Sequence, residues 1–295
     1  MTTTKTKSER RKAIFSVLLA AILWGTTGTS RALGSPGAGA ASVGSMRIIV
    51  GGFFLFIIAI RKAKITNWVN WTKESKIAIA AGTAGIVLYQ ISFFGAVSHA
   101  GVAIGTLVAI GSAPIASGLI GLIMKEIPSK RWFIATFLAL IGLFFLTSFS
   151  PNNPVSTYGI ILALAAGVCY STFTVSARFL ATQGNHGITT SATFFVLGSI
   201  IYAFSLPFDH LGWVFHPSGI MVSLWLGLAT VVAPYILFST GLNHIKASTA
   251  TTIGLAEPLT ATILGVTLLG EHFTLTSLLG ASLILIGIVI TASNN

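Results

Sequence analysis

Residues 102–124 read VAIGTLVAIGSAPIASGLIGLIM, a run without a single charged side chain. A helix crosses the roughly 30 Å hydrocarbon core of a bilayer with roughly 20 apolar residues, at about 1.5 Å per residue. The run is therefore long enough to span a membrane. Its proline, Pro114, cannot donate a backbone hydrogen bond, so we expect a helix here to be irregular near its middle.

The rest of the chain also has the composition of a protein whose main solvent is lipid. Of its 295 residues, 54% are hydrophobic and only 8% are charged, too few charges for the surface of a water-soluble domain of this size. Apolar runs separated by short polar or Gly- and Pro-containing segments predict ten spanning helices. Their predicted bounds are 13–33, 43–60, 77–97, 102–124, 132–149, 158–181, 190–208, 220–242, 249–269 and 274–292.

The same composition limits the chemistry. The single cysteine, Cys169, lies in an apolar run and offers neither an internal disulfide nor a thiolate metal cluster. The formal net charge is +11, but the basic residues sit in short loops, which argues against nucleic acid as a partner. No phosphate-binding loop of the GxxxxGKS or GxxxxGKT type occurs. We therefore expect no cofactor, no metal and no nucleic acid.

The basic residues also predict an orientation. If the N-terminus lies in the cytoplasm, all but two of the seventeen Lys and Arg residues fall in or beside inner loops. The two exceptions, Arg31 and Arg47, lie within the first two spans, toward their outer ends. The outer loops carry Asp209 and Glu271 but no Lys or Arg. This bias follows the positive-inside rule and predicts a multi-pass protein of the cell inner membrane with both termini cytoplasmic.

The two halves of the chain resemble each other at an offset near 145 residues. The matched segments keep the same order and occupy equivalent places among the spans. They are Ser98-His99 with Asn243-His244, Lys125-Glu126 with Gly270-Glu271, Ala139 to Gly142 with Ile284 to Gly287, Ala113-Pro114 with Glu257-Pro258, and Trp24-Gly25-Thr26 with Tyr170-Ser171-Thr172. We predict one five-helix repeat over 1–149 and a second over 158–295, together forming one membrane domain.

An odd number of helices in each repeat makes the second copy enter the membrane from the opposite side. The loops agree, because 61–76 carries five Lys or Arg residues and its counterpart 209–219 carries none. Two inverted halves can exchange conformations around one central site, which then opens to either side in turn. The sequence therefore predicts an all-α membrane protein of ten helices in two inverted repeats, and secondary transport by alternating access.

Several short segments resemble a known family. These are the Trp24-Gly25-Thr26 start, Arg47 in the second span, Glu257-Pro258 followed by Leu269-Gly270-Glu271, and Gly280 in the last span. In this order and spacing they resemble the EamA-type members of the drug/metabolite transporter superfamily, over nearly the whole chain. The first half departs from the pattern, with Ala113-Pro114 in place of Glu-Pro. The resemblance implies ten helices and the movement, often outward, of amino acids, related metabolites or drugs.

Four residues within the spans are candidates for the mechanism. Pro114 and Pro258 interrupt equivalent spans, a pattern that points to a central binding site, although either proline can also be a simple packing kink. Glu257 is the only acidic residue inside a span, where an unpaired carboxylate is costly. It is expected to bind a substrate amine, to carry a coupling proton or to cap broken backbone. Arg47 is expected to attract a carboxylate group or to extend outward to the interface.

Aromatic and hydroxyl side chains at helical spacing could line the same cavity. The residues predicted to line a substrate site are Trp24, Thr27, Arg47, Tyr89, Phe93, Pro114, Tyr170, Tyr235, Glu257 and Pro258. The alternative for the aromatic ones is packing or contact with lipid.

Two other functions remain as alternatives. A channel or facilitative pore would need polar rings along its length, and no selectivity-filter pattern occurs. An intramembrane enzyme would need a nucleophile, base or metal cluster within the spans, which hold one carboxylate. The sequence thus predicts a carrier for a small organic solute, not an enzyme, with an amino acid or a related compound as the expected substrate.

Overall fold

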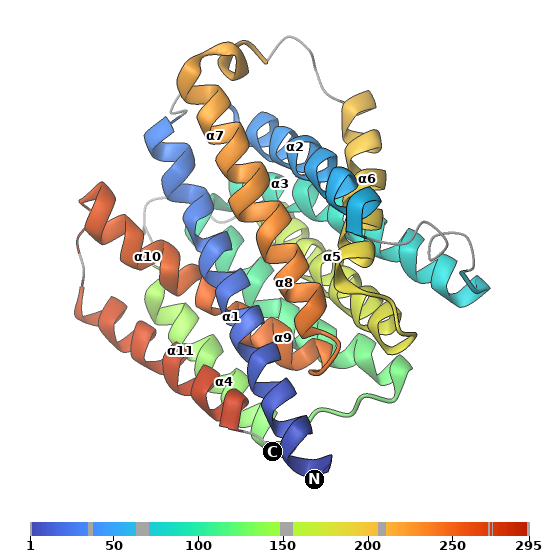
Figure 1. The fold of residues 1–295 in the computed structure, drawn as a ribbon. Helices are drawn as coiled ribbons and strands as arrows, with labels where there is room; N and C mark the ends of the chain where they lie inside the picture. The colour runs from blue at the N-terminus through green and yellow to red at the C-terminus, as the bar shows by residue number, and fades with distance from the viewer. Residues whose placement is uncertain are drawn as a thin grey trace.

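The computed structural model describes residues 2–34, 38–62, 71–147, 156–205, 211–270, 272 and 274–293, and within them it is helical throughout apart from short turns (Figure 1). The α-helices are α1 Thr2–Gly34, α2 Ala40–Lys62, α3 Lys73–Gly121, α4 Lys130–Leu146, α5 Thr157–Thr182, α6 Gly187–Ser205, α7 Pro217–Gly227, α8 Ala233–Gly241, α9 Ala247–Gly254, α10 Ala256–Leu269 and α11 Leu275–Ser293. Short 3-10 turns occupy Leu122–Met124 and Gly212–Phe215, and a π-helical turn, η5, occupies Leu228–Val232.

Eight helical segments of the described chain are long and apolar enough to cross a bilayer. They are Lys7–Leu33, Ser42–Arg61, Lys73–Met124, Thr157–Thr182, Gly187–Phe204, Pro217–Gly241, Ala247–Leu269 and Leu275–Ser293. Helix α4 is also apolar but has 17 residues. Each of the ten predicted stretches is helical over most of its described length, and the main difference is that two of them are joined in α3.

Helix α3 is two helical segments that turn back on each other at Gly101. This residue has φ 82° and ψ 162°, a conformation open essentially to glycine alone. A Cβ placed on Gly105 would lie 3.1 Å from the nitrogen of Val97. In one continuous helix, residues eight apart are separated by about 12 Å. The glycine turn therefore separates the predicted stretches 77–97 and 102–124, which are two helical segments and not one unbroken helix.

Helix breaks occur near Pro258 and Pro234, whereas the helix around Pro114 is continuous. The chain between α9 and α10 leaves the helix at Leu255, three residues before Pro258. The π-helical turn η5 ends two residues before Pro234, which removes a backbone donor at that point. The helix runs on through Pro114, however. Within α3 the backbone angles depart from helical values at Gly101 and not at Pro114. Hydroxyl groups supply hydrogen bonds around Pro114, from Ser171 to the carbonyl of Ala113 (2.8 Å) and from Ser117 to that of Pro114 (3.0 Å).

Two helix pairs pack closely and antiparallel. A Cβ on Gly142 of α4 would lie 2.6 Å from the carbonyl oxygen of Gly280 in α11, and one on Gly287 would lie 2.6 Å from that of Ala135. Residue numbers rise along α4 as they fall along α11, so the two helices run in opposite directions. The same holds for α2 and α6, in which Ser199 donates to the carbonyl of Ile48 (2.9 Å) and a Cβ on Gly52 would meet the carbonyl of Phe195 (2.6 Å).

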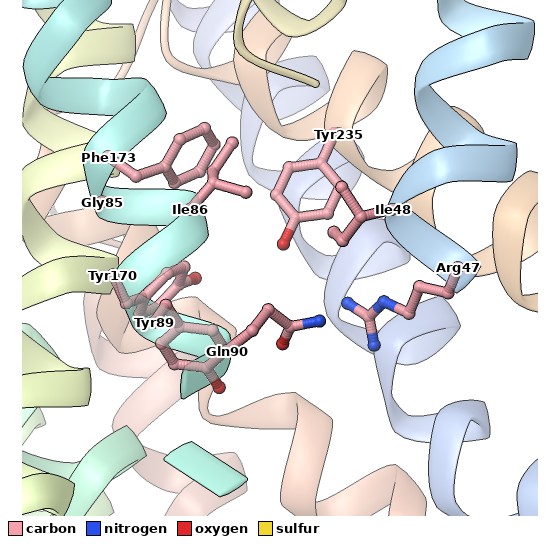
Figure 2. A pocket seen from close by; sticks show the side chains of 9 residues that line it. All are labelled: Arg47, Ile48, Gly85, Ile86, Tyr89, Gln90, Tyr170, Phe173 and Tyr235. Carbon is pink, nitrogen blue, oxygen red and sulfur yellow. The ribbon is translucent and has the colours of Figure 1, made fainter. Parts of the chain in front are cut away.

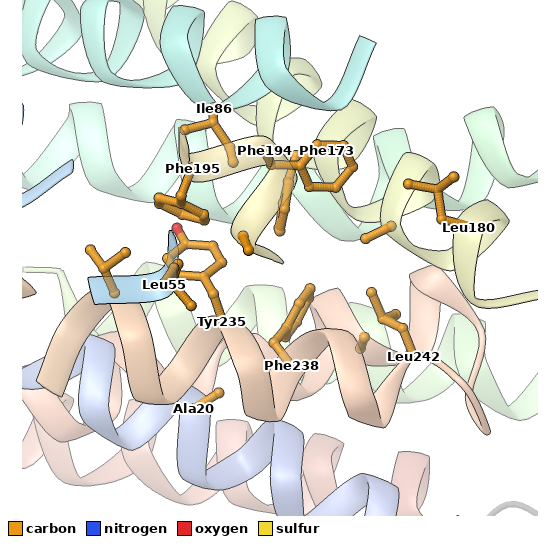
Figure 3. Close-up of a cluster of buried hydrophobic side chains, with 14 of the residues drawn as sticks. Ala20, Leu55, Ile86, Phe173, Leu180, Phe194, Phe195, Tyr235, Phe238 and Leu242 are labelled. Carbon is orange, nitrogen blue, oxygen red and sulfur yellow. The ribbon is translucent and has the colours of Figure 1, made fainter. Parts of the chain in front are cut away.

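The packed interior includes a group of large aromatic side chains from α5, α6 and α8. Phe173, Phe194, Phe195, Tyr235 and Phe238 interlock there, and each is almost fully buried (Figure 3). Many large apolar side chains instead point outward, such as Phe15 and Phe133. Apolar surface of this extent is stable in lipid and not in water, so it supports a membrane setting.

Both termini lie at the same end of the molecule (Figure 1). Arg10 near the start of α1 donates to the carbonyls of Ala292 (2.9 Å) and Thr291 (3.2 Å) near the end of α11. Lys246 before α9 donates to the carbonyl of Ile127 in the segment that joins α3 to α4 (2.6 Å). We call this the terminal end.

Candidate functional site

A small cavity lies between α2, α3, α5 and α8 in the middle of the helix bundle (Figure 2). The volume open to the centre of a water molecule is about 10 Å³, roughly what a single water needs. The residues that line it are Arg47, Ile48, Gly85, Ile86, Tyr89, Gln90, Tyr170, Phe173 and Tyr235. Four of the residues predicted for a substrate site, Arg47, Tyr89, Tyr170 and Tyr235, therefore meet here from four different helices.

Aromatic rings form the walls of the cavity and extend beyond it. The ring of Trp24 in α1 lies 5.0 Å from that of Tyr235 and 6.2 Å from that of Tyr170, measured between centroids. Tyr89 lies 6.0 Å from Tyr170 and stacks on Phe93 at 5.5 Å. The predicted aromatic residues thus form one connected cluster rather than a lipid-facing stripe.

One charge lies in the cavity and an opposite charge lies near it. The guanidinium of Arg47 points from α2 toward Gln90 and the hydroxyl of Tyr235 (Figure 2). Glu257 of α10 is not a lining residue, but its carboxylate lies within electrostatic range of Arg47, Tyr89 and Tyr170. Within the described residues Glu257 and Arg47 form no ion pair shorter than 4.0 Å, so the two charges do not neutralise each other by direct contact.

Two buried donors at this place lack a partner among the described residues. They are Nε of Arg47 and Nε1 of Trp24. A buried donor without a hydrogen bond costs about 1–3 kcal/mol, so such groups in a folded protein call for an explanation. A ligand with acceptor oxygens would supply one.

Comparison with known proteins decides the family. The sequence profile of the EamA-like transporter family matches this chain twice, over residues 11–148 and 157–293. The chain belongs to this family. It is a multi-pass membrane transporter of the drug/metabolite superfamily.

Relatives of this EamA-family transporter carry transporter names. The uncharacterized transporter YwfM of Bacillus subtilis is 37% identical over 94% of this chain and 92% of its own. The uncharacterized inner membrane transporter YicL of Salmonella typhimurium is 26% identical over 95% of each chain. The threonine/homoserine exporter RhtA of Escherichia coli K12 is 30% identical over 55% of this chain and 52% of its own.

A solved structure supports the fold of this EamA-family transporter. It is named only as the crystal structure of a protein, and it matches with a TM-score of 0.80 over 94% of this chain and 95% of that chain. The two sequences are 17% identical, so the likeness concerns the fold alone.

Close packing of α1 on α10 places Glu257 of the transporter beside the aromatic cluster. A Cβ on Gly25 would lie 2.7 Å from the carbonyl oxygen of Glu257 and 2.6 Å from Cβ of Thr260. Because Gly25 has no side chain, the two helices can approach this closely. Glu257 is half-buried in the first turn of α10, where the helix dipole favours a carboxylate.

The other six predicted residues lie outside the cavity lining; they are Trp24, Thr27, Phe93, Pro114, Glu257 and Pro258. The hydroxyl of Thr27 donates to the carbonyl of Trp24 (2.6 Å) within its own helix. Pro114 and Pro258 are buried in α3 and α10. The predicted outer-loop residues Asp209 and Glu271 fall outside the described residues.

The sequence reasoning missed Gln90, a buried residue of the cavity lining whose amide donates to the carbonyl of Gly44 (3.3 Å). The sequence signal for Gln90 was its neutral amide side chain, close to the aromatic pair Tyr89 and Phe93. It also missed the ion pair of Arg178 with Glu126, 2.7 Å apart at the terminal end. Arg178 donates in addition to the carbonyl of Leu242 (2.5 Å).

Proposed function

We propose that this protein is a secondary transporter that exports an amino acid or a closely related metabolite by alternating access. One observation carries the proposal: Arg47 lines a buried cavity with aromatic walls, its Nε has no partner in the described chain, and the opposite charge of Glu257 lies within electrostatic range of it. An amino acid carries a carboxylate and an ammonium group. Arg47 would bind the first and Glu257 the second.

The aromatic walls would bind the rest of such a substrate. Trp24 supplies a free indole N–H and the face of its ring, and Tyr89, Tyr170 and Tyr235 supply hydroxyls. Ligand sites commonly combine apolar walls with a few placed polar groups. Phe93, stacked behind Tyr89, would hold that ring in position.

The cavity is too small to hold an amino acid as it stands, since its volume has room for about one water. Binding therefore requires the helices around it to separate. The π-helical turn η5 and the break at Leu255 lie in the helices that carry Tyr235 and Glu257. Irregular turns of this kind are frequent at functional sites and in the broken helices of transporters. The breaks beside Pro234 and Pro258 are the expected places of bending, whereas the helix continues through Pro114, the counterpart of Pro258 in the first half.

Alternating access rests on two inverted repeats, which we propose on the following grounds. At an offset of 145 residues, Gly142 is equivalent to Gly287 and Gly280 is equivalent to Ala135. The contact of Gly142 with Gly280 is therefore equivalent to that of Gly287 with Ala135. Because α4 and α11 run in opposite directions, a two-fold rotation that places α4 on α11 turns the first repeat over. The second repeat is then inverted relative to the first. The capping of these helices agrees, because Ser129 accepts from the nitrogen of Trp132 and Thr274 from that of Ser277, at the same offset.

The central helices support the same relation. Gly25 is packed against the carbonyl of Glu257, and in the other half the hydroxyl of Ser171 donates to the carbonyl of Ala113. Repeat alignment pairs Gly25 with Ser171 and Glu257 with Ala113. The separate family matches to 11–148 and 157–293 are consistent with one such unit in each half.

We further propose ten membrane crossings with the terminal end in the cytoplasm. Segment Lys73–Met124 is 52 residues long, about 78 Å as a straight helix, more than twice the hydrocarbon thickness. With the turn at Gly101 it would cross twice, and α4 would cross as well. Basic residues gather at the terminal end, where Arg10, Arg178 and Lys246 bind carbonyl groups, and the positive-inside rule places such an end in the cytoplasm.

The proposed direction of transport and the proposed substrate class are based on the relatives. RhtA is named as an exporter of threonine and homoserine, and both compounds carry the paired charges that Arg47 and Glu257 would bind. Glu257 is also the residue that would carry a coupling proton, because its carboxyl group lies within electrostatic range of Arg47 in the cavity.

Proteoliposomes test the proposal. Purified protein should catalyse saturable counterflow of a neutral amino acid, and an imposed pH gradient should drive its accumulation. Glu257→Gln should abolish the response to the gradient, whereas Glu74→Gln, an exposed carboxylate at the start of α3, should not. A channel would instead show unsaturable conductance. Normal transport by Glu257→Gln at every pH would remove the carboxylate from the mechanism.

A further inference from the structure

A second and larger pocket lies at the terminal end, apart from the cavity of the proposed transport site. Its volume open to the centre of a water molecule is about 230 Å³, many times the roughly 10–15 Å³ that one water needs. The residues that line it are Arg10, Pro128, Ser129, Trp132, His244, Ile245, Lys246, Ser248 and Thr249. We call it the terminal pocket.

The terminal pocket is basic. Arg10 comes from α1, and His244 and Lys246 come from the turn before α9. No Asp or Glu is among the lining residues, although the carboxylate of Glu9 lies 3.9 Å from Nδ1 of His244. The positive charges of Arg10 and Lys246 are fixed in place by their hydrogen bonds to the carbonyls of Ala292 and Ile127.

Helix α9 adds backbone donors at the same place. It begins at Ala247, directly after Lys246, and no side chain caps its first turn. Ser248 and Thr249, in that first turn, line the pocket. Free N–H groups and the positive end of a helix dipole favour an anion. Hydroxyls, backbone amides and two cations thus surround one hollow, and this combination is the usual protein site for a phosphate group.

We propose that the terminal pocket binds a phosphate group, carried either by the headgroup of an anionic lipid or by free phosphate. Basic pockets between transmembrane helices at the cytoplasmic side bind anionic headgroups in other membrane proteins. A bound phosphate would join α1, α4 and α9, helices of both halves of the chain. It would hold these helices together at the terminal end, and this role does not depend on which substrate is transported.

Thermal unfolding of the full-length protein in detergent tests the site. Phosphatidylglycerol in mixed micelles, or inorganic phosphate at constant ionic strength, should raise the unfolding midpoint by several degrees, as expected for a ligand that binds only the folded state. Phosphatidylcholine and chloride should not. A shift with phosphatidylglycerol alone assigns the site to a lipid headgroup, and a shift with both assigns it to the phosphate group itself.

Thr249→Asp is the decisive variant. A carboxylate at the third residue of α9 favours the helix N-terminus and repels phosphate, so the variant should fold and lose the shift. Thr276→Asp places the same charge in the first turn of α11, away from the pocket, and should keep it. Lys246→Gln should weaken the apparent affinity about tenfold, because a charge-assisted bond is lost, whereas Lys130→Gln should not. Absence of any shift, or an equal shift in Thr249→Asp, would overturn the proposal.

Discussion

Arg47 is the residue on which substrate recognition most depends in this account. Its guanidinium lies in the cavity with Nε unpaired within the described chain. A planar guanidinium binds a carboxylate through two parallel hydrogen bonds, which an ammonium group cannot reproduce. Geometry as well as charge is therefore expected to matter at this position.

Arg47→Lys should keep the charge and lose the paired hydrogen bonds. We expect KM for an amino acid to rise about tenfold, since one charge-assisted bond contributes about 1.5–3 kcal/mol. The measurement is the concentration dependence of counterflow in proteoliposomes. Arg31→Lys is the matched control, because Arg31 lies in the last turn of α1, where it donates to the carbonyl of Ala38 (3.1 Å), and does not line the cavity. An unchanged KM in Arg47→Lys would show that Arg47 is structural.

At this scale the sequence identified charged and aromatic residues but not their neutral neighbours. Arg47 and Glu257 stood out because a charge within a span is costly. Gln90 carries no charge and gave no comparable signal, yet it lies beside Arg47 (Figure 2). Its place in the cavity depends on the approach of α3 to α2, which a single sequence does not encode locally.

Among the elements, the contact of α1 with α10 sets the position of Glu257. Gly25→Ala adds a Cβ that would meet the carbonyl of Glu257 at 2.7 Å and Thr260 at 2.6 Å, so the helices must separate at a cost of about 1–3 kcal/mol. We expect a lower thermal unfolding midpoint and slower transport.

Gly28→Ala, one turn further along α1, is the matched control. A Cβ there meets nothing within 4 Å, and alanine favours a helix over glycine by about 1 kcal/mol. It should therefore leave the midpoint unchanged or raise it. Equal effects of the two substitutions would contradict the packing described here.

Helix positions followed from the sequence because apolar runs and polar breaks are local properties. Helix regularity did not, because it depends on neighbours. Pro114 was expected to interrupt its helix, but α3 continues through it. Hydroxyls of Ser171 and Ser117 bind the carbonyls of Ala113 and Pro114 at this place. Pro234 has no partner proline in the first half, yet it follows a π-helical turn.

For the whole molecule, the ion pair of Arg178 with Glu126 ties the first half to the second at the terminal end. It is 2.7 Å long, and the two side chains are 16% and 13% exposed. Glu126→Gln should lower stability by about 1–3 kcal/mol, because Arg178 would remain as a largely buried cation with a single carbonyl partner. Thermal unfolding of Glu126→Gln, Arg178→Gln and the double variant measures the coupling. Simple additivity of the two losses would contradict a direct role for the pair.

The central claim is that the two halves lie in the membrane in opposite orientations. Ile127 and His272 are exposed and equivalent at an offset of 145 residues, so in a Cys169→Ser background each can be replaced by a single cysteine. A membrane-impermeant thiol reagent added to intact cells should label His272→Cys at once and Ile127→Cys only after the membrane is permeabilised. Labelling of both positions from the same side would contradict the inverted repeat and, with it, the proposed alternating access.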